Sequence, residues 1–161
     1  MKSHDPAKAL IGSLTAQGMT LAIAESLTGG LLCARICDIP GASKVFWDGV
    51  VCYSERAKSF RLGVSAKTLR EYSPVSEEVA KEMAVGIRKT LDVDIGVSTT
   101  GVAGPGPDER GDPQGLFYIG IATREDVRVF RFQESGSRSE IREKAARYAI
   151  DILLDLFGNG S

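Results

Sequence analysis

The stretch TLAIAESLTGGLLCARIC, residues 20–37, decides the fold. Its first part, residues 20–24, is short and apolar and is followed by polar residues, which is typical of a buried strand. Two consecutive glycines then mark a turn, and helical periodicity resumes in LLCARIC. Because an apolar helix is also predicted at residues 6–17, the chain begins as helix, strand, glycine turn and helix.

The same alternation of helices and strands continues to the end of the chain. The runs LFYIGIAT and VRVFRF flank REDV, which indicates an antiparallel hairpin. The other predicted elements are a buried strand at residues 49–53, a short helix at 65–72, a helix capped by Ser76, a strand at 94–100 and a closing helix from about residue 139. This order predicts one α/β domain over residues 1–161, a three-layer αβα sandwich with a mixed sheet.

Two of these helices carry further side-chain signals. In the helix after Ser76, one face repeats apolar residues that we expect to be buried, namely Val79, Met83, Ile87 and Leu91. In the closing helix, Ser137 and Glu140 have the spacing of a capping box.

Composition narrows the possible function classes. The chain has 20 basic and 21 acidic residues, a net charge of −1 and a pI of about 5.9. Proteins that bind nucleic acid usually show a strongly basic face, so that class is disfavoured. No apolar run approaches the ~20 residues of a membrane span, and no signal-peptide pattern opens the sequence. We therefore expect a cytoplasmic protein with neither nucleic-acid nor membrane partners.

The cysteines and the histidine argue against metal and triad chemistry. Cys33, Cys37 and Cys52 all lie within apolar sequence, and we expect them to be small core residues. The single histidine, His4, lies in a polar N-terminal tail. Zinc sites and histidine-based triads are therefore disfavoured.

Two glycine-rich stretches after predicted strands are candidates for ligand binding. In AESLTGG, Gly29 and Gly30 allow backbone amides to approach an anion at a helix N-terminus, although the same turn can be purely structural. The stretch STTGVAGPGPDERGDPQG, residues 98–115, places Thr100 and Gly101 beyond the carboxyl end of a strand, where ligands gather in α/β sheets. Its alternative interpretation is a solvent-exposed connection.

A third stretch, GASKVFWDGVVCYSERAKSF at residues 41–60, contains Ser43, Tyr53 and Lys58. Without a usable histidine, a serine can still be activated by a neutral lysine whose pKa is lowered by burial or by nearby positive charge. The alternative interpretation is a serine turn, a tyrosine at a strand end and a solvated lysine. Spacing alone favours this alternative.

Several of these stretches, taken together, resemble the C-terminal domain of the CinA competence/damage-inducible family. The similar segments, in chain order, are AESLTGGLLCARICDIPGAS, GVVCYSERAK, LGV, VSEEVAKEMAVG, STTGVAGP and PQGLFYIGIA. The resemblance implies an amidohydrolase that converts nicotinamide mononucleotide to nicotinic acid mononucleotide and ammonia through a serine–lysine centre with an assisting tyrosine. It places these catalytic roles on Ser43, Lys58 and Tyr53.

The resemblance also implies a substrate-binding set. It comprises Ser26, Thr28, Gly29, Gly30, Thr100, Gly101, Arg138 and Arg142. The amides of residues 28–30, with one of the two arginines, would hold the 5′-phosphate, and Thr100 would orient the amide. We expect the protein to bind a small molecule, a pyridine mononucleotide, and to form a homo-oligomer. We expect no metal or other cofactor. The alternative is a nucleotide- or phosphosugar-binding module that has lost turnover.

This sequence departs from the family pattern at three positions. Leu27 stands where many members have cysteine, and Ala42 stands where serine is common. Asp112 replaces a lysine near the expected mouth of the site, and this change is expected to affect substrate affinity more than chemistry.

Overall fold

A mixed sheet of five strands, in the order β2-β1-β3-β4-β5, forms the middle of the molecule. The computed structural model describes residues 5–158, so His4 and the ends of the predicted domain lie outside the described residues. Strand β1 is parallel to β2 and β3, whereas β4 is antiparallel to β3 and β5. The strands are β1 Leu21–Glu25, β2 Phe46–Val51, β3 Ile95–Gly101, β4 Leu116–Ala122 and β5 Val127–Gln133.

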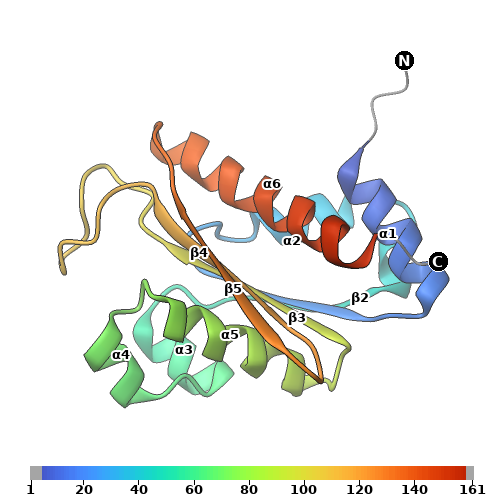
Figure 1. The fold of residues 1–161 in the computed structure, drawn as a ribbon, viewed down its shortest axis with the longest axis horizontal. Helices are drawn as coiled ribbons and strands as arrows, with labels where there is room; N and C mark the ends of the chain where they lie inside the picture. Colours follow the sequence, from blue (N-terminus) through green and yellow to red (C-terminus); the bar gives the residue numbers. More distant parts are fainter. Residues whose placement is uncertain (1–4, 159–161) are drawn as a thin grey trace.

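Helices cover both faces of the sheet, as Figure 1 shows. One layer contains α1 Pro6–Gln17, α2 Leu31–Cys37 and α6 Arg138–Phe157. The other contains α3 Glu55–Leu62, α4 Ala66–Tyr72 and α5 Glu77–Thr90. A short 3-10 turn, η1 Ala42–Lys44, precedes β2. The predicted three-layer αβα sandwich is therefore confirmed. No helix within residues 5–158 is long and apolar enough to cross a bilayer.

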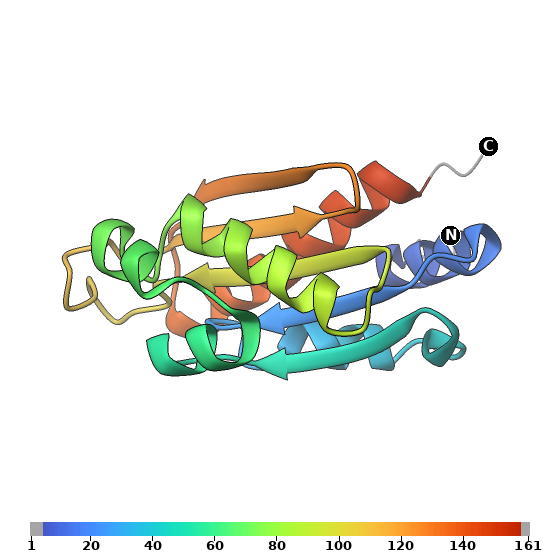
Figure 2. The ribbon, with the colours of Figure 1, turned by 90° about the horizontal axis from the view of Figure 1, so that it is seen from below.

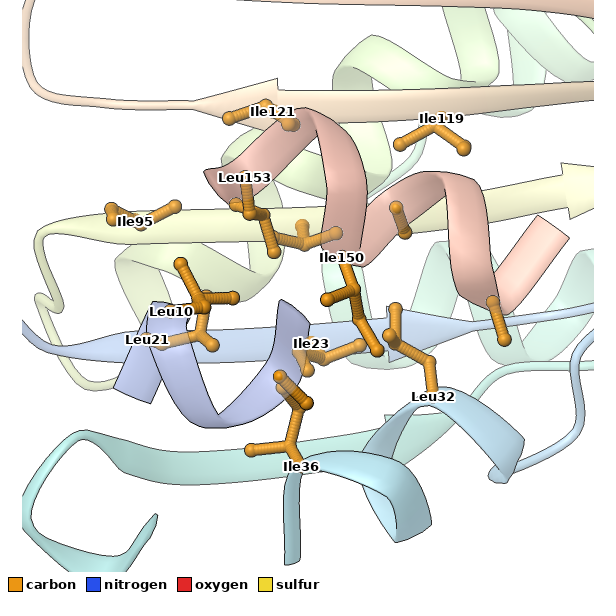
Figure 3. Packing of buried hydrophobic residues seen from close by; sticks show 14 of the residues in the cluster. Leu10, Leu21, Ile23, Leu32, Ile36, Ile95, Ile119, Ile121, Ile150 and Leu153 are labelled. Atoms are coloured by element: carbon orange, nitrogen blue, oxygen red, sulfur yellow. The ribbon is translucent and has the colours of Figure 1, made fainter. Parts of the chain in front are cut away.

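The larger part of the core lies between the sheet and the α1, α2 and α6 layer (Figure 3). All residues of β1 are buried, because β1 has a strand on each side and helices on each face. Its Leu21 and Ile23 face Leu10 of α1 and Ile36 of α2 in this layer. This burial fixes β1, and with it the position of the turn that follows Glu25.

The strand predicted as buried at residues 49–53 is instead an edge strand, and the structure corrects the prediction. β2 spans Phe46–Val51 and pairs only with β1, so its side chains alternate between intermediate and exposed. The helix α3 was not predicted, because its sequence ERAKSFRL has no clear apolar face.

Two further expectations about burial were wrong. Leu91 follows the last residue of α5 and is 49% exposed, because the helix ends before the apolar repeat does. Of the cysteines, Cys52 is buried and Cys33 partly buried, but Cys37 is exposed at the end of α2. The predicted capping box of Ser137 and Glu140 is confirmed.

Candidate active site

The candidate site lies where three parallel strands end at the same edge of the sheet. The arrowheads of β1, β2 and β3 point to one end of the molecule in Figure 2, and the loop of residues 102–115 extends from that end. Ser26 follows β1, Tyr53 follows β2 and Thr100 is the last but one residue of β3. The connections of β1 and β3 lead in opposite directions along the sheet, which creates the kind of crevice where α/β folds bind ligands.

Lys58 is the one buried basic side chain in residues 5–158, with 2% exposure. It lies on α3, and its Nζ is 2.9 Å from Ser26 Oγ, 2.9 Å from the Cys52 carbonyl and 3.3 Å from the Tyr53 carbonyl. Burial lowers the pKa of the Lys58 amine from 10.5 to about 8, although Cys52 and Glu55 act in the opposite direction. The amine is thus close to the range in which it can act as a base.

Ser26 is held in place by β3. Its backbone N–H donates to the carbonyl of Thr99 at 3.0 Å and lies 3.3 Å from the Thr99 hydroxyl. The Thr99 hydroxyl is also 2.7 Å from the hydroxyl of Thr28. Ser26 itself is buried, with 7% exposure, and its hydroxyl takes part in a buried contact with Lys58.

The turn after Ser26 does not offer a free helix N-terminus for phosphate. The carboxylate of Glu25 accepts hydrogen bonds from the N–H groups of Leu32 and Cys33, both at 2.9 Å, in the first turn of α2. Gly29 and Gly30 adopt φ values of 60° and 102°, which glycine tolerates best. A phosphate held by residues 28–30 would therefore lie close to a carboxylate that already occupies this helix end.

The two arginines of α6 have different partners. Arg142 donates to the carbonyls of Leu27 and Thr28, both at 2.9 Å, and so fixes the turn rather than facing open space. Arg138 donates to the Gly104 carbonyl at 2.5 Å and to the Tyr53 hydroxyl at 3.0 Å. Of the two, Arg138 is exposed and lines a cavity.

That cavity has a volume of about 260 Å³. Tyr53 and Arg138 line it, together with Gly101 at the end of β3 and residues 102–108 of the loop that follows. Tyr53 is 60% exposed, so its side chain is accessible at the border of the cavity. Tyr53 therefore meets Lys58 through its backbone carbonyl and meets Arg138 through its hydroxyl.

Thr100 and Gly101 hold β3 against neighbouring parts of the chain, Thr100 by a hydrogen bond and Gly101 by close packing. The Thr100 hydroxyl donates to the Pro74 carbonyl at 2.7 Å, so its proton is directed toward the chain before α5. A Cβ at Gly101 would come within 2.4 Å of Phe117 Cβ, and glycine is therefore needed for close approach to β4. Gly101 also lines the cavity.

The structure separates Ser43 from Tyr53 and Lys58, and this corrects the predicted centre. Ser43 is exposed in η1 before β2, whereas Tyr53 and Lys58 follow the other end of β2. A strand rises about 3.3 Å per residue, so the six residues of β2 alone separate its ends by roughly 17 Å. Ser26, which was predicted to bind substrate, is the serine that contacts Lys58.

Known proteins resemble this chain in sequence. A sequence model of the CinA C-terminal domain matches residues 3–157. The chain belongs to the CinA family. A Caldicellulosiruptor saccharolyticus protein described as competence-damage inducible is 47% identical over 144 residues, 89% of this chain and 35% of that protein. A CinA-like protein of Kosmotoga olearia is 43% identical over 144 residues, again 89% and 35%. The chain thus spans about a third of the length of these curated relatives.

Solved CinA structures share the whole fold. A CinA superfamily protein of Klebsiella pneumoniae superposes with a TM-score of 0.93 at 32% identity, covering 98% of each chain. A competence or damage-inducible protein of Enterobacter asburiae gives a TM-score of 0.92 at 32% identity, covering 94% of this chain and 96% of that one.

In this CinA domain the loop of residues 102–115 is fixed by its own side chains. Asp112, the departure from the family pattern, accepts a hydrogen bond from the Ser73 hydroxyl at 2.8 Å. Gln114 accepts from the Gly106 N–H at 2.8 Å and donates to the Gly136 carbonyl at 3.1 Å. The loop is thereby tied to the end of α4 and the start of α6.

Sequence reasoning missed three contributors to the site: Glu25, Cys52 and Thr99. Cys52 and Thr99 act partly through backbone atoms, which no side-chain pattern reveals. For Glu25 a signal existed, because a carboxylate in an otherwise apolar strand must find partners when it is buried.

Proposed function

We propose that this CinA domain is an amidohydrolase that deamidates nicotinamide mononucleotide, with Ser26 as nucleophile and Lys58 as general base. The observation that carries the proposal is the buried contact of 2.9 Å between Ser26 Oγ and Lys58 Nζ. A carboxamide is a weak electrophile, so its hydrolysis calls for an activated nucleophile. The lowered pKa of Lys58, about 8, makes a neutral amine available near neutral pH.

The geometry around Lys58 suits proton transfer from Ser26. Lys58 Nζ has three polar contacts, with Ser26 Oγ and with the carbonyls of Cys52 and Tyr53. A neutral amine has two N–H groups for the two carbonyls, and its one lone pair would then accept the hydrogen bond from the Ser26 hydroxyl. Lys58 takes the hydroxyl proton as Ser26 Oγ attacks the carboxamide carbon. It then delivers that proton to the departing nitrogen, and the C–N bond breaks to release ammonia. Lys58 then takes a proton from the water that attacks the resulting ester and returns it to Ser26 Oγ as the acyl C–Oγ bond breaks. The product leaves as a carboxylic acid, which ionises in solution.

The cavity lined by Tyr53 and Arg138 suits the pyridine ring and the phosphate of the substrate. The exposed Tyr53 ring borders it and offers a face on which a pyridine ring can stack. Arg138 lies at the same cavity, and its guanidinium can exchange the Gly104 carbonyl for a phosphate, a stronger acceptor. Backbone N–H groups of the turn after Ser26 would stabilise the oxyanion.

Ammonia release tests this proposal directly. We expect the protein to release ammonia from nicotinamide mononucleotide and to act far more slowly on free nicotinamide, which lacks the phosphate for Arg138. Calorimetric titration with the mononucleotide runs in parallel. Binding without any ammonia release would show a nucleotide-binding module instead of an enzyme, and the absence of both would exclude the pyridine mononucleotide as ligand.

A further inference from the structure

Glu25 is the one buried carboxylate within residues 5–158, with no exposed surface. An ionised side chain is costly to bury unless hydrogen bonds compensate it. The Glu25 carboxylate obtains two from the backbone, from the N–H groups of Leu32 and Cys33, and it also faces the positive end of α2. The thiol of Cys33 is a third neighbour of this carboxylate. Burial is the main cause that raises the pKa of the thiol, and its hydrogen bond to Glu25 is the second.

This capping arrangement is not the ordinary one. Helices usually take their N-terminal cap from the residue that immediately precedes them. Here that residue is Gly30, which has no side chain to offer, and the cap comes from the last residue of β1. Glu25 therefore couples the end of a central strand to the start of α2, across the turn that begins with Ser26.

Glu25 also closes a ring of contacts around the reacting pair. Its backbone carbonyl accepts from the Cys52 N–H at 2.8 Å. The Cys52 carbonyl accepts from Lys58 Nζ at 2.9 Å, and Lys58 Nζ in turn contacts Ser26 Oγ at 2.9 Å. Ser26 is covalently joined to Glu25, so Glu25 meets both members of the pair: Ser26 directly and Lys58 through Cys52.

We propose that Glu25 is a positioning residue that holds Ser26 in register with Lys58. This inference rests on the proposed function of the Ser26–Lys58 pair. Glu25 does not touch the substrate; its two carboxylate oxygens fix the path of the chain from β1 into α2. If the turn shifts, Ser26 Oγ moves relative to Lys58 Nζ, and a misplacement of about 1 Å can reduce the rate roughly 100-fold.

Glu25→Gln is the sharpest variant, because it keeps the shape of the side chain. The amide presents an N–H₂ group to one of the two N–H donors and leaves that donor without a partner. Asp38→Asn is the matched control, because Asp38 is an exposed carboxylate at the other end of the same helix. If Glu25→Gln does not fold, Glu25→Asp takes its place, since it keeps the charge but is too short to reach both donors.

The experiment measures kcat, KM and amide hydrogen exchange for the full chain, with nicotinamide mononucleotide as substrate. For Glu25→Gln we expect kcat to fall at least about tenfold with KM nearly unchanged, and exchange at Leu32 and Cys33 to accelerate. Asp38→Asn should match the wild type. Faster exchange with an unchanged kcat would show that Glu25 merely caps α2, and it would overturn the inference.

A second readout separates this inference from the proposed function. A fluorophosphonate probe reports the reactivity of Ser26 without any nucleotide. A wild type that releases no ammonia but is labelled at Ser26, faster than Glu25→Gln, would refute the deamidase and support the positioning role. A wild type that is neither active nor labelled would overturn both.

Discussion

Lys58 sits beneath the surface of the site with an amine that touches one hydroxyl and two carbonyls. None of these three partners carries a formal charge, so nothing in direct contact compensates a protonated amine. Burial is therefore the main reason for its lowered pKa. The same burial would make the amine a usable base and would exclude bulk water from its lone pair.

The rate should depend on the protonation of Lys58. Because the base must be neutral, we expect kcat/KM to rise with pH and to level off above about pH 8, the pKa of Lys58. Below that value the rate should fall about tenfold per pH unit. A pH–rate profile between pH 6 and 9.5 checks this, with the exposed Lys44→Ala as control. A flat profile would exclude Lys58 as the base.

The free energy of unfolding should also depend on the protonation of Lys58, because the pKa of this residue differs between the folded and the unfolded state. The folded-state pKa of Lys58 lies below the ordinary 10.5, so the unfolded chain binds more protons between about pH 8 and 10.5, and the free energy of unfolding rises with pH there. Relative to Lys58→Met, the wild type should gain about 3 kcal/mol across this window. Urea unfolding of both proteins at pH 7.5, 9 and 10.5 measures the difference. A constant difference would show that Lys58 titrates normally.

Among the elements, α5 packs so closely on the sheet that glycine is required beneath it. A Cβ at Gly96 of β3 would lie 2.2 Å from the Ala84 carbonyl oxygen of α5, and the backbone of both elements would have to move. We expect Gly96→Ala to destabilise the fold by about 1–3 kcal/mol. Gly12 of α1 has nothing within 4 Å of its added Cβ, so Gly12→Ala should stabilise by up to about 1 kcal/mol. Thermal unfolding of both variants tests this, and equal effects would contradict the packing account.

The start of α6 is set by its capping box, and Arg138 is the first residue of that helix. Ser137→Ala removes the hydrogen bond to the Glu140 N–H, and it should cost about 1 kcal/mol of unfolding free energy. It should also raise KM, because Arg138 would be less well placed at the cavity. Ser139→Ala, on an exposed neighbour, serves as the control. A change in stability alone would show that the cap does not act on substrate binding.

For the whole molecule, the sandwich could be predicted because strong local signals agree with it. β1 is a short apolar run, the hairpin of β4 and β5 flanks a polar turn, and α5 and α6 begin with serine caps. β2 was placed wrongly because an apolar run does not show whether a strand is central or at an edge. The helix α3 escaped prediction because one of its two buried residues is a lysine.

The site could be predicted only in part, because its central contact joins distant segments. Lys58 and Ser26 are 32 residues apart in the sequence, and no spacing rule links them. The sequence does indicate that, without a usable histidine, a serine can still be activated by a neutral lysine. Which serine the lysine meets depends on how β1 and β2 align in parallel, since both strands deliver their carboxyl ends to the same edge.

The most direct test of the account compares Ser26→Ala with Ser43→Ala in one assay of ammonia release from nicotinamide mononucleotide. The predicted result is a loss of at least about 1,000-fold in kcat for Ser26→Ala, because no nucleophile remains beside Lys58, and a change of less than about twofold for Ser43→Ala, at the far end of β2. Full activity in Ser26→Ala, with loss in Ser43→Ala, would contradict the central claim that Ser26 and Lys58 form the reacting pair.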